Sequence, residues 1–192
     1  MTVKPIHALK LPEVPREQFD EGLRKYFNVA EEKLGFLPNV LRAYAWNPDR
    51  LRWFSRFYNE IMLGDSSLSK LEREMIAVVV SSLNRCWYCQ VAHGAAVRQM
   101  GRDPALGEQM VMNWRAADLI PRQRAMLAFA EKLTLESSKV VEADRQALRD
   151  VGFTEAEIWD ICDVTGLFAM TNRVASGVGM QPNPQYHAAD RQ

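Results

Sequence analysis

The chain has 192 residues, of which 47% are hydrophobic and 25% charged, ordinary values for a globular protein. Its 24 Lys and Arg balance its 24 Asp and Glu, so there is no electrostatic reason to expect a nucleic acid or an anionic membrane as partner. No apolar run reaches the roughly 20 residues that cross a bilayer, and the first residues lack the apolar stretch of a secretory signal. We therefore expect a cytoplasmic protein with no membrane partner.

Proline, glycine and capping residues divide the chain into helical segments joined by short turns. Residues 1–15 carry three prolines and are expected to form an extended arm. Further along, the Ser69–Glu72 capping box predicts the start of a helix, and Thr154–Glu157 predicts another. In chain order we expect helices at 16–34, 37–46, 48–63, from 70, 85–100, from 103, 121–135, 141–150 and 154–168, then an irregular tail over 178–192.

No segment shows the sustained two-residue alternation of a half-buried strand, so we predict an all-α protein. It is expected to be a multi-helix bundle in a single domain over residues 1–192. The Val-rich run at 76–80 could form a buried strand, but the capping box before it favours a helix. The segments 68–77 (LSKLEREMIA) and 119–128 (LIPRQRAMLA) are similar, which is consistent with an internal helical duplication. Shared helix periodicity alone would also produce this similarity.

The residues with reactive side chains gather in one segment, 84–94 (NRCWYCQVAHG). Cys86, Cys89 and His93 follow one another at three- and four-residue steps, so on a helix all three project from one face. With Asn84 as N-cap, Cys86 would lie in the first turn, where free amides and the helix dipole favour a thiolate. His93 could accept the proton of Cys89 as a general base.

Glu74 precedes this segment and is a candidate to orient the pair or to relay protons, if the turn near residues 83–84 folds the two helices together. On a helix the two cysteines would stand about 5–6 Å apart at Cβ, farther than a disulfide prefers, so a bond between them would be strained and easily reduced. Two other interpretations stay open, a metal site completed by His93 and Glu74 and a pair of inert buried thiols. The third cysteine, Cys162, has no neighbouring base and is interpreted as a core thiol.

The spacing of these residues matches a known pattern. Glu74, followed after twelve residues by Cys86-x-x-Cys89-x-x-x-His93, resembles the motif of the AhpD-like alkylhydroperoxidases of the carboxymuconolactone decarboxylase superfamily. Three further stretches of this chain resemble the uncharacterised peroxidase-related subgroup of that superfamily, namely GFLPN (35–39), NP (47–48) and LSKLERE (68–74). The resemblance covers residues 35–177. It implies an AhpD-like helical fold whose members assemble as trimers, often paired into hexamers.

The resemblance also implies a role for each residue of the motif. Cys89 would attack the peroxide and Cys86 would resolve the product as a disulfide. His93 would be the base, and Glu74 would belong to a proton relay. The helix dipole alone would instead favour Cys86 as the more ionised thiol.

Tyr88 departs from the family pattern, because the relay histidine of AhpD-like enzymes stands at this position. A tyrosine shuttles protons poorly near neutral pH, which puts the relay and the physiological substrate in doubt. Trp87, beside Cys86, is interpreted either as a core residue or as part of a pocket wall.

The function expected from the resemblance is that of a thiol-dependent peroxidase in antioxidant defence. Hydrogen peroxide or organic hydroperoxides would be the substrates, and a dihydrolipoamide-like or thioredoxin-like dithiol would be the reductant. No cofactor or metal is expected, since motifs for nucleotides, flavins and zinc proteases are missing from the sequence. The alternatives are a carboxymuconolactone decarboxylase-type enzyme, whose branch generally lacks the CxxC, and a non-catalytic redox sensor or disulfide-exchange protein.

Overall fold

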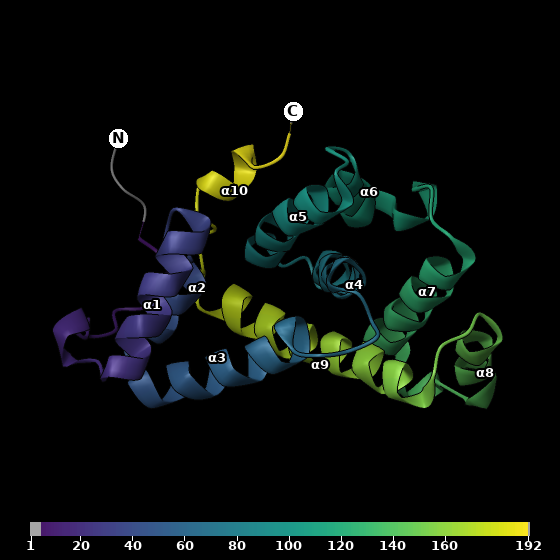
Figure 1. Cartoon of the computed structure of the whole chain (residues 1–192), viewed down its shortest axis with the longest axis horizontal. Helices are drawn as coiled ribbons and strands as arrows, with labels where there is room; N and C mark the ends of the chain where they lie inside the picture. The colour runs from purple at the N-terminus through teal and green to yellow at the C-terminus, as the bar shows by residue number, and fades with distance from the viewer. Residues whose placement is uncertain (1–4, 192) are drawn as a thin grey trace.

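The computed structural model describes residues 5–191, and that part of the chain contains helices and no strand (Figure 1). The all-α prediction is therefore confirmed. The helices are α1 (Glu21–Leu34), α2 (Asn39–Tyr44), α3 (Pro48–Leu63), α4 (Lys70–Leu83), α5 (Trp87–Gly101), α6 (Leu106–Asn113), α7 (Pro121–Glu136), α8 (Glu142–Asp150), α9 (Glu155–Gly177) and α10 (Gln185–Ala188). Three 3-10 turns accompany them, η1 (Arg16–Gln18), η2 (Trp114–Ala116) and η3 (Ser137–Lys139).

Helix α4 lies at the centre of the bundle, enclosed by α5, α6, α7 and α9 (Figure 1). It begins at the predicted capping box, in which Ser69 and Glu72 each accept a hydrogen bond from the other's backbone N–H. Every residue from 72 to 81 is buried. The Val-rich run is thus helical, and its apolar character is that of a helix covered on all sides.

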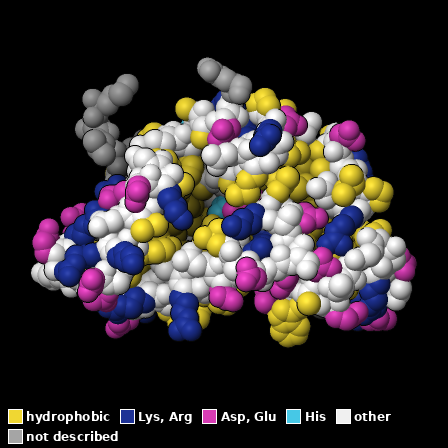
Figure 2. All heavy atoms as spheres, in the orientation of Figure 1, with side chains coloured by type: hydrophobic (Ala, Val, Ile, Leu, Met, Phe, Trp, Pro, Cys, Tyr) yellow, Lys and Arg dark blue, Asp and Glu magenta, His cyan; other side chains and the backbone are white. Residues whose placement is uncertain are grey.

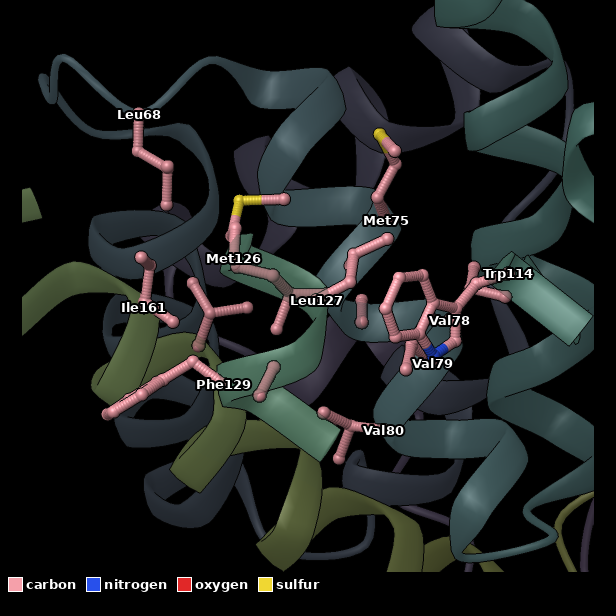
Figure 3. Packing of buried hydrophobic residues seen from close by; sticks show 14 of the residues in the cluster. Leu68, Met75, Val78, Val79, Val80, Trp114, Met126, Leu127, Phe129 and Ile161 are labelled. Atoms are coloured by element: carbon pink, nitrogen blue, oxygen red, sulfur yellow. The ribbon is translucent and has the colours of Figure 1, made fainter. Parts of the chain in front are cut away.

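The main core forms where α4 meets α7 and α9 (Figure 3). Met75 and Val79 of α4 pack in one cluster with Met126 and Leu127 of α7 and Ile161 of α9, each at most 1% exposed. Burying a side chain of this size is worth about 1.5–3 kcal/mol. The packing therefore fixes α4, which carries Glu74, firmly in place.

A second, smaller core joins α1, α2 and α3. Its buried members are Phe19, Leu23, Phe27, Leu41 and Leu51. The partly buried Val40 of α2 packs both on this cluster and on the one around Cys86 and Cys89. The N-terminal helices thereby form one side of the region that contains the cysteines.

The two similar sequence segments make matching contacts. Arg73 donates from Nε to the carbonyl five residues before it and from Nη1 to the carbonyl nine residues before it. Arg124 of α7 repeats both hydrogen bonds at the same separations. Both arginines tie the start of a helix to the turn that precedes it.

Several boundaries differ from those expected. Helix α6 begins at Leu106, because Pro104 lies in a turn, and α9 continues past Phe168 to Gly177. The tail is not wholly irregular, since it contains α10 and is hydrogen-bonded to the bundle, with Asn183 Oδ1 accepting from the backbone N–H of Asn39 at 2.6 Å. Among the residues described, no helix has the length and apolar character needed to cross a bilayer.

Candidate active site

The turn between α4 and α5 places Cys86 at the start of α5. The N–H of Cys86 bonds to Ser81 O and the N–H of Arg85 to Ser82 O, a Schellman motif that requires a left-handed residue. Arg85 takes that conformation, with φ 53°. The expected cap is therefore wrong, because Asn84 is the C-cap of α4 and Cys86 itself is the N-cap of α5.

Cys86 and Cys89 lie side by side in a small apolar cluster. They are 1% and 3% exposed, and the cluster also contains Ala43, Ala175 and Met180 from α2, α9 and the tail. Both are free thiols in this structure. A buried thiol in purely apolar surroundings would keep its proton, so the polar neighbours decide the charge of this pair.

Those neighbours lower the pKa of Cys86 to about 6. The main cause is hydrogen bonding from the Cys89 thiol, helped by the backbone N–H of Cys89, the hydroxyl of Ser176 and the nearby charge of His93, and opposed by burial. Of the two thiols, Cys86 is therefore the one whose surroundings favour the thiolate, and the cause is its hydrogen bonds.

The pKa of Cys89 moves in the opposite direction. The negative charge of Cys86, to which the Cys89 thiol donates, raises the pKa of Cys89 far above its ordinary value, and burial adds to this effect. Asn172 and Ser81 lie beside the Cys89 sulfur and favour its anion through hydrogen bonds. Asn172 Nδ2 also donates to Ser81 Oγ at 2.9 Å, which holds both polar groups beside the sulfur.

Glu74 of α4 and His93 of α5 form a close pair. The Nδ1 atom of His93 lies 2.6 Å from Oε2 of Glu74, and both side chains are mostly buried. The edge-to-face contact of Phe168 with the imidazole, at 4.6 Å between ring centroids, fixes the ring further. The expected folding of the two helices onto each other thus brings these residues together.

Tyr88 and Trp87 point into different surroundings. The Tyr88 hydroxyl accepts a hydrogen bond from the backbone N–H of Val40 at 3.1 Å, and burial raises its pKa well above the ordinary value. It therefore ties α5 to α2 and stays protonated. Trp87 is 51% exposed and lies on the wall of a small surface cavity of about 140 Å³, with His187 nearby.

Four polar residues near the sulfurs were not predicted as site residues from the sequence, namely Ser81, Asn172, Ser176 and Tyr186. Asn172 is 1% exposed and lies within α9, beyond the end expected for that helix. The one sequence feature that could have identified it is an amide side chain within an otherwise apolar helical segment. Tyr186 comes from the tail and packs against the cysteine cluster. Arg173, the neighbour of Asn172, is exposed and faces away from the core.

The surface near the cysteine cluster is concave. Figure 2 shows a hollow between the side formed by α1 and α2 and the side formed by α5, with hydrophobic side chains around it and a histidine side chain visible within it. Within residues 5–191, no three His, Cys, Asp or Glu side chains are grouped so as to hold a metal ion.

Comparison with known proteins agrees with this geometry. Residues 48–132, which include Glu74, Cys86, Cys89 and His93, match the carboxymuconolactone decarboxylase family. The chain is 55% identical to an uncharacterized peroxidase-related protein from Silicibacter sp. TM1040, with a TM-score of 0.94 over 100% of this chain and 99% of that one. The chain belongs to the carboxymuconolactone decarboxylase family.

Within this family the chain is similar to AhpD-like proteins. An uncharacterized peroxidase-related protein from Ralstonia eutropha JMP134, described as an alkylhydroperoxidase AhpD core, is 40% identical, with a TM-score of 0.94 over 99% of each chain. The uncharacterized protein YdfG of Bacillus subtilis (strain 168) is 27% identical over 118 residues, which are 59% of this chain and 78% of that protein. The predicted AhpD-like fold is thereby confirmed.

Proposed function

We propose that this protein is a thiol-dependent peroxidase that reduces hydrogen peroxide or organic hydroperoxides through the Cys86–Cys89 pair. The observation that carries the proposal is the buried Cys86–Cys89 pair at the start of the helix that carries His93, whose Nδ1 lies 2.6 Å from Glu74 Oε2. Polar neighbours lower the pKa of Cys86 to about 6, which favours its thiolate at neutral pH. A thiolate is the form that attacks peroxide oxygen. The Glu74–His93 pair beside it supplies groups that exchange protons.

The remaining proton of the dithiol belongs to the pair rather than to one sulfur. It rests on Cys89, and its transfer to Cys86 moves the anion to Cys89 without any change in net charge. Cys89 is the proposed attacking residue, as in the AhpD-like enzymes, and Ser81 and Asn172 support its anion. The Cys86 thiolate thus serves Cys89 as its first proton acceptor.

The chemistry then proceeds in two steps. The Cys89 sulfur attacks one peroxide oxygen, an S–O bond forms, the O–O bond breaks, and the alkoxide takes a proton to leave as alcohol. Cys86 next attacks the sulfenic acid on Cys89, so that a disulfide forms and hydroxide leaves. The peroxide is reduced by two electrons and the dithiol is oxidised by two.

His93 and Glu74 are proposed to move the protons of these steps. With Nδ1 hydrogen-bonded to Glu74, the imidazole keeps one tautomer and leaves Nε2 to accept and return a proton. Tyr88 is proposed to take no part as a relay, because its hydroxyl is occupied by Val40 and stays protonated.

Turnover needs a dithiol reductant, for which we propose a dihydrolipoamide-like or thioredoxin-like donor. A reducing cytoplasm would be the setting of this chemistry. We also propose a homo-oligomer, trimeric or hexameric. Its support is the number of large apolar side chains that the described surface exposes, among them Trp53 (63%), Met112 (80%) and Trp159 (70%).

The test is consumption of tert-butyl hydroperoxide by the purified protein with excess dihydrolipoamide. Many turnovers per chain are expected, with Cys89→Ser and Cys86→Ser each slower by at least about 100-fold. Cys162→Ser is the matched control and should keep the wild-type rate, because Cys162 lies outside the cysteine cluster. A Cys89→Ser variant as fast as the wild type would contradict the proposal, and one oxidation per chain without turnover would favour a redox sensor.

A further inference from the structure

The C-terminal segment is held over the cysteine cluster by buried polar contacts. Arg98 of α5 is 4% exposed, and it donates from Nε to Ala189 O and from Nη2 to Tyr186 O, both at 3.0 Å. At the other end of the segment, Asn183 bonds to α2. A buried guanidinium that lost these carbonyls would be left unsatisfied, so the closed position of the segment is strongly favoured.

This attachment directs the side chain of Tyr186 inward. The ring packs against the cluster that contains Cys86 and Cys89, and it meets Phe36 edge-to-face at 5.0 Å between centroids. In Figure 1, α10 lies above the gap between α2 and the first turn of α5. Tyr186 therefore belongs to the surroundings of the dithiol, although it follows Cys89 by nearly a hundred residues.

The hydroxyl of Tyr186 has no partner among the side chains and backbone of residues 5–191. Burial, together with the negative charge of Glu74, raises its pKa to about 12. At neutral pH the group is thus a protonated donor, and its ring packs on the cluster that contains both cysteines. A hydroxyl donor that no protein acceptor occupies is free to bind an oxygen atom of a ligand.

Resting on the function proposed above, we propose that Tyr186 is a catalytic residue that donates a hydrogen bond to the leaving oxygen of the hydroperoxide. As Cys89 attacks and the O–O bond breaks, negative charge develops on that oxygen, and a fixed donor stabilises it more in the transition state than in the ground state. The Tyr186 proton stays on Tyr186. The proton that completes the alcohol is the one removed from Cys89.

The experiment measures two rates on the reduced full-length protein. The first is single-turnover oxidation by tert-butyl hydroperoxide, and the second is alkylation of the same thiols by iodoacetamide, which needs the thiolate but no leaving oxygen. Tyr186→Phe should slow oxidation by about tenfold or more, as for loss of one hydrogen bond to a charged oxygen. It should leave alkylation within about twofold. Tyr44→Phe is the matched control, since Tyr44 is also partly buried and stacks on Phe54.

Each outcome decides a separate claim. Slower oxidation with unchanged alkylation supports the catalytic role of Tyr186. Oxidation at the wild-type rate overturns that role, and an equal loss in both rates overturns it in favour of a purely structural one. A wild-type protein that hydroperoxide does not oxidise overturns the proposed function, and the role of Tyr186 with it.

Discussion

A thiolate loses its water when it is buried, so the protein around it must supply replacement donors. Cys86 has three, the thiol and the backbone N–H of Cys89 and the hydroxyl of Ser176. The largest contribution to the lowered pKa of Cys86 comes from Cys89. The pKa of each thiol therefore depends on the protonation of the other.

This dependence predicts the pH behaviour of the thiols. Alkylation of Cys86 in the Cys162→Ser background should follow a titration with a midpoint near pH 6, falling as pH drops through that value and the thiolate is protonated. Cys89→Ala removes the main donor, so the midpoint should move upward toward that of an ordinary cysteine. The measurement is the rate of iodoacetamide alkylation between pH 4 and 10. A wild-type midpoint that Cys89→Ala does not change would contradict this explanation.

Some residues of the site could be predicted from the sequence and others could not. The helical spacing of Cys89 and His93 and the approach of Glu74 follow from local periodicity. The exact place of Cys86 does not, because it depends on Arg85 adopting a left-handed conformation that arginine rarely takes. Tyr186 could not be predicted as a site residue, because only tertiary contacts bring the C-terminal segment to the two cysteines.

At the scale of elements, the first turns of three helices meet at one arginine. Arg122, in the first turn of α7, pairs with Glu157 of α9 at 2.5 Å and lies 3.5 Å from Glu72 of α4. Both carboxylates also close capping boxes. The guanidinium stacks over Phe153 at 3.6 Å from the ring centroid. One side chain therefore links the starts of α4, α7 and α9.

Arg122→Ala should lower the free energy of unfolding by about 2–3 kcal/mol, because it leaves two largely buried carboxylates without their cation. Arg145→Ala is the control, since Arg145 pairs with Glu142 at the surface and should cost less than about 0.5 kcal/mol. Urea unfolding followed by circular dichroism measures both. Equal effects of the two substitutions would show that Arg122 does not link the helices.

The sequence predicts where helices occur more reliably than where they end. Capping boxes identify the starts of α4 and α9 because the hydrogen bonds that cap a helix are local in sequence. The end of α9 was misplaced because residues after Phe168 stay helical through packing of Asn172 and Ala175 against the cysteine cluster and α4. Such packing is a tertiary effect that sequence periodicity does not contain.

At the scale of the whole molecule, the fold brings four distant parts of the chain to one place. Helix α4 supplies Glu74, α5 supplies the cysteines and His93, α9 supplies Asn172, and the tail supplies Tyr186. The rigid core around α4 holds the Glu74–His93 pair, while the tail depends on the few hydrogen bonds made by Arg98, Asn39 and Asn183. The site is thus held partly by the main core and partly by hydrogen bonds of the C-terminal segment.

The most direct test of the central claim is the product of a single oxidation. The reduced protein is treated with one equivalent of tert-butyl hydroperoxide, the remaining thiols are alkylated, and peptides are analysed by mass spectrometry. We predict a Cys86–Cys89 disulfide, with the loss of two hydrogen atoms and with Cys162 still alkylated. Recovery of Cys86 and Cys89 both alkylated, with the hydroperoxide unconsumed, would contradict it.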